Sequence, residues 1–368
     1  MFITSVIAFI IGIYAEALNA FPLTLIIVLL FVFICLSGFL LKKKHQVALP
    51  FILVSFMLIG ALRIGIVGAY LQPVDINDDE TIYEGLVIEA SPAVKTVRIS
   101  QPSGPAGIRA IYRTAENIGI NDRVKIFGRL KELALTYNNP HAISWKWIKR
   151  LEGTSCEIRG ITVSVTKGNN YIEAWRNRLR EKIEGSRSKH TDIIKALTIG
   201  DATGIDEPTR TLFLRTGTSH ILAISGSHMG IVTAFFFFFA RIFFRMSPVL
   251  KYRGDDRRFA ALLSIPFAFM FMVTAGSSIP TIRAAIMITV YMLSLYFERG
   301  RNIMNTIALS ALIILIIYPH SIFMPAFQLT FASVSFIILF TEKIYPMIAA
   351  KNRAVKWLRS EEHTSELQ

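Results

Sequence analysis

The sequence predicts a polytopic α-helical membrane protein with about eight transmembrane helices and an inserted extracytoplasmic small β-barrel. Three observations support this fold class. Of the 368 residues, 52% are hydrophobic, and the mean hydropathy is positive. The apolar residues are gathered in blocks about as long as a bilayer is thick. One long polar stretch, residues 71–190, separates two groups of these blocks and contains alternating, β-branched segments.

The apolar blocks define two membrane regions, 1–70 and 191–359. The first block has no basic n-region and no small-residue cleavage site before the second block begins, so we expect it to stay in the mature protein. The blocks lie at 1–18, 21–41, 47–70, 219–244, 259–275, 279–297, 303–318 and 325–341.

The basic residues predict the orientation. If the spans alternate, the segments at 42–46, 241–258, 298–301 and 351–359, all rich in Lys and Arg, share one side. The opposite loops, NAFP, AGSSIP and YPHSIFMP, contain neither residue. Since cytoplasmic loops carry the Lys and Arg excess, we expect a cytoplasmic N-terminus and an extracytoplasmic location for residues 71–190. Much of the net charge of +14 then comes from loops that orient the chain in the membrane.

Residues 71–168 predict a β-domain. The segments TIYEGLVIEA, VKTVRISQP, GIRAIYRT, RVKIFGRLKEL and TSCEIRGITVSV read as about five short strands. One way for these strands to close is a five-stranded OB-type barrel. Such barrels bind single-stranded nucleic acid or oligosaccharides. A plain β-domain that shields the membrane part fits these residues equally well.

Residues 169–190 predict a basic amphipathic helix. Ile172, Trp175, Leu179 and Ile183 recur at helical spacing, and four basic residues fill the positions between them. Such a helix suits a membrane surface, so we expect Trp175, Arg176 and Arg180 to anchor it at the interface. Contact of its arginines with DNA phosphates is the alternative.

The most unusual apolar block begins with the polar run AISGSH, residues 223–228. Counting back from Arg241 at 1.5 Å per residue places His228 roughly 20 Å into a hydrocarbon core of about 30 Å. Polar groups at this depth need partners inside the protein. We expect the helix to be broken or tightly packed here, with Gly226 and Gly230 as a small-residue packing pair.

Polar residues within the apolar blocks predict a hydrated path. Clustered polar groups inside a membrane, one of them ionisable, mark a pathway more often than simple helix contacts. Hydrogen bonding between packed helices is the alternative, and Arg283 could also extend to the membrane surface. The residues expected to line the path are His220, Ser225, Gly226, Ser227, His228, Arg283, Gln328 and Ser335.

The sequence gives little support for catalytic, nucleotide-binding or metal chemistry. The chain has no G-x-S-x-G elbow, and Ser225 and His228, three residues apart on a helix, are not positioned as an activated nucleophile, so an intramembrane hydrolase is a distant alternative. There is no P-loop. Cys35 lies in an apolar block and Cys156 in a polar one, which predicts no disulfide. We expect no metal, no cofactor and no enzymatic activity.

The stretch ALTIGDATGIDEPTRTLFLRTGTSHILAISGSHMGIV, residues 196–232, resembles the signature of the ComEC family of competence proteins. NNPHAISWKWIKRLEG, SSIPTIRAAIM and FMPAFQLTFASVSF are similar to further family segments. The sequence departs from the family pattern at Ser227, Thr330 and His141, where Leu, Ser and Gly are common. No segment resembles the metallo-β-lactamase-like nuclease domain that many relatives carry.

The resemblance implies a channel component that carries single-stranded DNA across the bacterial cytoplasmic membrane during natural transformation. Its implied partners are single-stranded DNA, membrane lipid, a membrane DNA receptor and a cytoplasmic DNA translocase, while a homo-oligomer stays open. A transporter or assembly component for another anionic polymer or solute is the alternative. Residues 360–368 resemble a translated adapter and are expected to be non-native.

Overall fold

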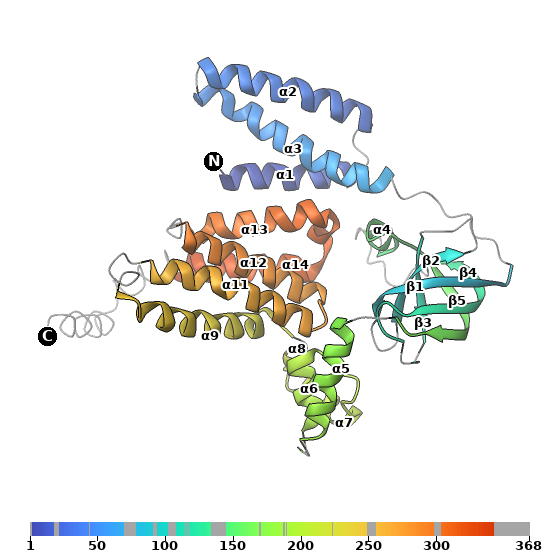
Figure 1. Ribbon diagram of the computed structural model, residues 1–368. Coiled ribbons are helices and arrows are strands. Elements are labelled where there is room, and N and C mark those ends of the chain that lie inside the picture. Colours follow the sequence, from blue (N-terminus) through green and yellow to red (C-terminus); the bar gives the residue numbers. More distant parts are fainter. Residues whose placement is uncertain are drawn as a thin grey trace.

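Helices dominate the structure, a computed structural model, and one β-barrel stands at their end (Figure 1). The apolar helices run roughly side by side, and the barrel and the short helices that follow it lie at the same end of them (Figure 1). The described residues are 2–17, 22–43, 45–69, 79–90, 94–101, 108–114, 116, 118–133, 145–168, 171–186, 188, 190–222, 224–248, 255–297 and 303–341. The predicted tail, residues 360–368, lies outside these ranges.

Three helices form the N-terminal part of the described structure. They are α1 (Phe2–Ala17), α2 (Leu23–Lys43) and α3 (His45–Ala69). Helices α1 and α3 cross closely because Gly12 faces the backbone of Met57 and Gly60 faces the backbone of Phe9. A side chain at either glycine would collide with the facing carbonyl, so small residues permit this approach.

The C-terminal helices make up the rest of the apolar body. They are α9 (Gly226–Arg245), α11 (Asp256–Thr274), α12 (Ile279–Tyr296), α13 (Ile303–Ile317), the 3₁₀ helix η1 (Pro319–Phe323) and α14 (Pro325–Leu339). Helix α13 packs against α1, and one buried cluster joins Phe9 and Ile13 with Ile314 and Leu315. The two groups of helices, far apart in sequence, therefore share a core.

Four helices in the described part of the chain are long and apolar enough to cross a membrane. They are α3 over Ala48–Ile66, α9, α11 and α12. Four further apolar helices, Phe2–Ala17, Leu23–Ser37, Ile303–Ile317 and Pro325–Leu339, are shorter. Each predicted block contains one of these eight helices, while the number that cross stays a prediction.

One of the predicted blocks contains a break. The block at 219–244 is divided because the chain leaves helical geometry between α8 (Ser219–Leu222) and α9. Ser225 is extended, with φ −108° and ψ 171°, and α9 begins at the next residue. This agrees with the expectation that the helix is broken at AISGSH.

The polar region forms a closed five-stranded barrel with the order β1-β2-β3-β5-β4. All neighbours are antiparallel except β3 and β5, which are parallel. Alternate residues fill the interior, among them Val87, Ile99, Ile126 and Ile158. The strands are β1 (Thr81–Ala90), β2 (Val94–Gln101), β3 (Arg109–Arg113), β4 (Arg123–Glu132) and β5 (Thr154–Thr166), with α4 (Trp145–Leu151) before β5.

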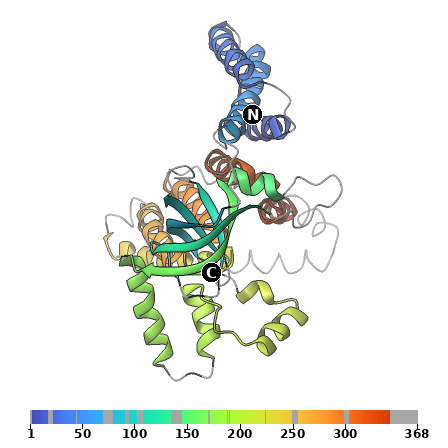
Figure 2. The same cartoon turned by 90° about the vertical axis from the view of Figure 1, so that its right-hand side faces the viewer.

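Three short helices follow the barrel, α5 (Tyr171–Glu184), α6 (Thr191–Ile199) and α7 (Glu207–Arg215), and α8 comes after them. Helix α5 is the predicted basic amphipathic helix, and it packs against α6. In the view from the barrel end, this group lies beside the barrel (Figure 2). The turn after α6 places Gly200 in the left-handed region with φ 72°.

Candidate functional site

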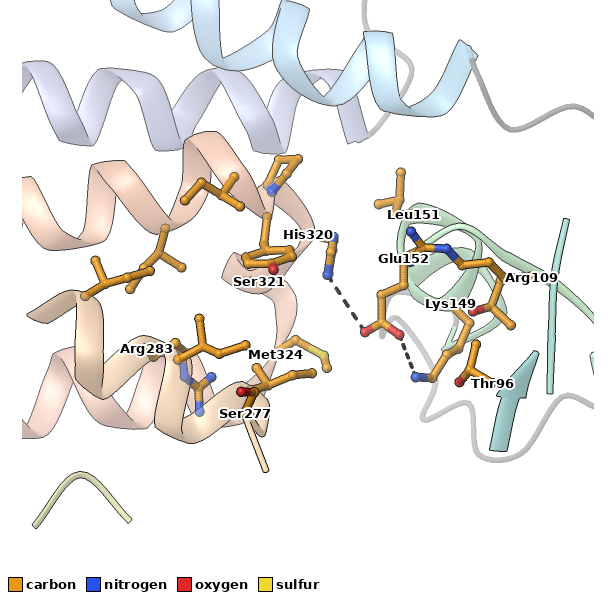
Figure 3. Close-up of a pocket in the computed structure, with 18 of the residues that line it drawn as sticks. Thr96, Arg109, Lys149, Leu151, Glu152, Ser277, Arg283, His320, Ser321 and Met324 are labelled. Atoms are coloured by element: carbon orange, nitrogen blue, oxygen red, sulfur yellow. Dashed lines mark hydrogen bonds and ion pairs between the residues drawn. The ribbon is translucent and has the colours of Figure 1, made fainter. Parts of the chain in front are cut away.

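A pocket of about 350 Å³ lies where the barrel meets the apolar helices. Figure 3 shows α4 and the barrel on one side of it and α12, α13 and η1 on the other. Its walls come from segments distant in sequence, because Arg63 belongs to α3, Thr96 to β2, Lys149 to α4 and Arg283 to α12. Such a junction between two units is a common place for a binding site.

The described lining of the pocket is strongly basic. Glu152 is its one acidic side chain. The side chains that carry or can carry positive charge are Arg63, Arg109, Lys149, Arg283 and His320. Low-dielectric walls lined with one sign of charge concentrate counter-ions of the opposite sign. The pocket is therefore suited to an anion.

Glu152 links the barrel side of the pocket to the helix side. Lys149 Nζ donates to Glu152 Oε2 at 2.6 Å, and Arg109 Nη1 donates to the Glu152 carbonyl at 3.2 Å. Across the pocket, His320 Nε2 lies 3.8 Å from Glu152 Oε1. Burial lowers the pKa of His320, an effect that Glu152 opposes and that Lys149 and Arg63 reinforce. The imidazole is thus neutral near pH 7.

Arg63 supports the wall formed by α13. Its Nε donates to the carbonyl of Ile316 at 2.6 Å and its Nη2 to that of Ile317 at 3.2 Å. These are terminal carbonyls of α13, which lack partners within the helix. A cation at a helix C-terminus also interacts favourably with the helix dipole. Arg63 therefore fixes the end of α13 beside η1.

Arg283 lies on the opposite wall from Lys149 and Glu152 (Figure 3). Its side chain is buried, with 7% of the residue exposed, and its Nε has no hydrogen-bond partner among the described residues. Glu152 Oε1 and His320 Nδ1 are also buried without a hydrogen-bond partner there. Buried polar atoms are normally satisfied by protein, water or ligand. Three such atoms around one pocket point to a polar occupant.

The AISGSH segment is not part of the described pocket lining and forms the start of α9. Ser225 caps α9, and the third residue of that helix, His228, folds back so that its Nδ1 accepts from Ser225 N at 3.2 Å. Ser225 Oγ lies 2.9 Å from the same nitrogen and 2.7 Å from Ser227 Oγ. The run satisfies the exposed backbone of a helix start with its own side chains, as a capping box does.

Ser225 Oγ and His228 Nδ1 do lie within hydrogen-bond distance, although the sequence predicted that these residues are not positioned as an activated nucleophile. That expectation assumed that both residues were inside one helix, whereas Ser225 precedes α9. The pair still lacks the third member of a catalytic set, because no carboxylate bonds to His228 in the described residues. Its Nδ1 is occupied by the cap, so the neutral ring carries its proton on Nε2.

The two glycines of this segment differ. A Cβ at Gly226 would lie 3.7 Å from Ala284 Cβ, so the start of α9 packs against α12 at Ala284. At Gly230 no described atom lies within 4 Å of such a Cβ. The expected packing role therefore fits Gly226, whereas Gly230 has no close neighbour in the described part of the chain.

Outside the AISGSH segment, the predicted path residues lie apart from one another. Of the eight, only Arg283 lines the described pocket. Gln328 Nε2 donates to the Ile322 carbonyl at 2.8 Å and so holds η1 to α14. Ser335 is half-buried two turns further along α14. His220 lies in α8, and its side chain is outside the described residues.

The residues predicted to anchor α5 at the membrane interface also differ in their surroundings. Trp175 is half exposed on α5, as an anchor requires. Arg176 instead reaches inward, where Nη2 donates to the Ile199 carbonyl at 3.0 Å and Nε to the Thr274 carbonyl at 3.2 Å. Arg180 pairs with Asp201 at 2.8 Å. Both arginines thus tie α5 to its neighbours, because helix ends and a carboxylate offer them partners inside the protein.

Sequence reasoning missed most of the pocket. Arg63 lies within the predicted span 47–70, and an arginine inside an apolar block is a signal for function or pairing. His320 was visible only as part of a loop without Lys or Arg. Lys149 and Glu152 lie in the family-like segment NNPHAISWKWIKRLEG, but no pattern assigned them to a site, because only the fold brings α4 against η1.

Comparison with known proteins connects this site to a family. The family model "Competence protein" matches residues 197–365, which include the AISGSH segment and the α12, α13 and η1 walls of the pocket. Residues 197–365 are therefore similar to the competence protein family. The competence-family match begins within α6, so it leaves out the barrel and the N-terminal helices.

Two curated relatives bear names that refer to competence. The chain is 32% identical to ComE operon protein 3 of Bacillus subtilis (strain 168) over 158 residues, 43% of this chain and 19% of that protein. It is 26% identical to Competence protein ComA of Neisseria gonorrhoeae over 135 residues, 35% and 19% of the two chains.

A third relative is Recombination protein 2 of Haemophilus influenzae (strain ATCC 51907 / DSM 11121 / KW20 / Rd), 32% identical over 92 residues, 25% of this chain and 11% of that protein. The chain thus matches less than a fifth of the length of ComE operon protein 3, 19%. None of the three names denotes an enzyme. No solved structure matches the chain.

Proposed function

We propose that this chain is a membrane channel component that carries single-stranded DNA across the cytoplasmic membrane during competence. The observation that carries the proposal is the basic pocket at the junction of barrel and helices, where the buried Arg283 has an unpaired Nε. A DNA strand that leaves water needs cationic and hydrogen-bonding groups in place of its hydration. Similarity to the competence family supports the choice of DNA as the anion.

The proposed orientation places the barrel, the pocket and α5 outside the cytoplasm and the N-terminus inside. The barrel and α5 to α8 lie at one end of the apolar helices (Figure 1). At the other end Arg241 and Arg245 surround Asp256, 3.2 Å and 3.5 Å away. This excess of arginine supports a cytoplasmic location for that end. About eight crossings follow if the four shorter apolar helices also span.

The proposed path starts at the barrel. Its strand order, β1-β2-β3-β5-β4 in a closed barrel, supports an OB-like domain. The strand then passes Arg283, which attracts phosphate, and the start of α9, which packs against α12 at Ala284. There Ser227 and the Nε2–H of His228 offer weak donors without fixed charge, and conduction needs contacts that release their ligand.

The proposed partners follow from this role. Single-stranded DNA is the substrate, membrane lipid surrounds the helices and contacts Trp175, and a membrane DNA receptor and a cytoplasmic translocase act before and after the channel. The chain itself has no enzymatic role in this scheme. Transport or assembly of another anionic polymer remains the second candidate, because the pocket selects for charge and its described lining contains no aromatic side chain other than Tyr318 and His320.

The test is substitution of Arg283 at the native locus, read as transformation frequency with linear DNA. Arg283→Gln removes the buried charge and should lower transformation by at least tenfold, since a charge-assisted contact contributes roughly 1.5–3 kcal/mol. Arg283→Lys should retain part of the activity. Arg178→Gln, which changes an exposed arginine on α5, is the matched control. Normal transformation by an Arg283→Gln protein of normal abundance would exclude the proposed path.

A further inference from the structure

The outer face of the barrel carries an exposed apolar row. Ile82 on β1 pairs with Phe127 on β4, and Phe127 pairs with Ile161 on β5. These side chains are 52%, 39% and 70% exposed, although the barrel interior is already filled by its own core. Neighbouring apolar side chains that remain in water mark a binding surface. We call Ile82, Phe127 and Ile161, with the flanking Lys125 and Arg129, the outer strip.

The charges around Phe127 are basic. In β4 buried and exposed residues alternate, and the outward residues are Arg123, Lys125, Phe127, Arg129 and Lys131. Outward residues two apart are about 6.8 Å from one another along a strand, so this row extends over roughly 27 Å. Lys125 is already paired with Glu84 on β1. The row still places one central ring between cations, which matches an extended, negatively charged strand of bases.

One cross-strand pair works against the stability of the barrel itself. Arg129 lies directly opposite Arg159 on β5, and like charges in facing positions are destabilising. Arg159 has only a distant partner, Glu157 at 3.7 Å, which Arg113 approaches more closely at 3.2 Å. Arg129 forms no ion pair within the described residues. An anion laid across the two arginines would relieve this repulsion.

Two other occupants fit less well. The barrel is closed, so these strands have no free edge to which a peptide could add as a further strand. A lipid surface is disfavoured by position, because β5 faces the viewer in Figure 2 and thus lies on the side of the barrel turned away from the apolar helices. A phosphate polymer with exposed bases can stack a base on the aromatic ring and place its phosphates beside the arginines.

We propose that the outer strip binds single-stranded nucleic acid, with one base stacked on Phe127 and adjacent phosphates on Arg129 and Arg159. The choice of nucleic acid rests on the proposed function, but the site is separate from the pocket. It also differs from the strand 2 and 3 face that OB barrels generally use, which here contributes Thr96 and Arg109 to the pocket.

The test measures binding of a fluorescein-labelled oligothymidylate to the full chain in nanodiscs by anisotropy. Phe127→Ala should raise Kd about tenfold, because stacking of one base contributes roughly 1–3 kcal/mol. Phe127→Trp should bind as well as the parent. Arg129→Gln should reduce the slope of log K against log salt by roughly one. Arg98→Gln, an exposed arginine on β2, is the control and should change affinity little.

The outcomes separate this inference from the proposed function. If Phe127→Ala and Arg129→Gln bind like the parent, or if duplex DNA binds as tightly as the single strand, the outer strip is not the site. If they lose binding while Arg283→Gln transforms normally, the strip is right and the transport path is wrong. Because Phe127 faces solvent, its removal leaves the barrel core intact, which protection of the buried Cys156 thiol from reagents verifies.

Discussion

The backbone N–H of Ser225 donates to Nδ1 of His228 at 3.2 Å, so the histidine of the AISGSH segment closes the first turn of α9. This contact explains why polar residues are tolerated here, because the orphan N–H groups of a helix start need acceptors that lipid cannot supply. It also leaves the other ring nitrogen free to act as a donor.

Substitution of His228 separates its capping role from a role in transport. His228→Leu removes the acceptor and should cost about 1 kcal/mol of stability through the lost cap. His228→Gln keeps a capping-box acceptor at this position but has no imidazole. We expect both variants to insert and both to lower transformation frequency. If His228→Gln transforms like the parent, His228 serves only as a cap.

The Glu152 and His320 contact predicts a pH dependence for the junction of α4 with η1. Since burial lowers the pKa of His320, the folded state favours the neutral ring, and the unfolded chain binds a proton more readily. Stability should therefore be full above the ordinary histidine pKa of about 6.5 and fall as the pH drops below it. Thermal unfolding in detergent from pH 7.5 to 5 measures this fall. In His320→Asn the fall should be smaller, and an equal fall would assign it to other groups.

Asp122 is expected to hold two loops of the barrel together. Its carboxylate accepts from Gly119 N at 2.8 Å, Gly168 N at 3.0 Å and Lys167 Nζ at 2.9 Å. Burial acts to raise the pKa of Asp122, but these hydrogen bonds outweigh it and the pKa lies below its ordinary value. The carboxylate thus stabilises the barrel above about pH 4 and loses this effect as the pH falls further. Asp122→Ala should destabilise by about 2 kcal/mol.

The reactivity of Cys156 can report barrel opening in that experiment. This thiol lies in the barrel core, and burial raises its pKa to about 12. Only the thiolate reacts, so the folded barrel should protect it. In a Cys35→Ala background, Asp122→Ala should be labelled faster than the parent. Equal labelling rates would mean that Asp122 does not support the barrel.

The orientation can be tested by cysteine labelling in intact cells. Ser164 is exposed on β5, and Ser247 follows the opposite end of α9. In the Cys35→Ala background, Ser164→Cys should react with a membrane-impermeant maleimide added outside, and Ser247→Cys should react only after lysis. The reverse pattern would place the barrel in the cytoplasm.

Sequence patterns alone determined the apolar helices, the five strands and the basic helix, but not the short helices α4, α6 and α7. The positions of the apolar blocks, the five strands and the basic helix all follow from periodicity, which depends on local side-chain burial. The break at AISGSH could also be expected, because Ser and Gly in a run favour a helix start over a helix interior.

Only the tertiary structure decided which residues form the pocket. Arg63, Glu152, Arg283 and His320 come from four separate elements, and no local pattern connects them. Sequence position was also insufficient for Arg176. Its place on α5 suits a lipid surface, but its side chain donates to carbonyls of α6 and α11. Long charged side chains bond to the nearest partner in space, and which partner that is depends on how distant elements pack.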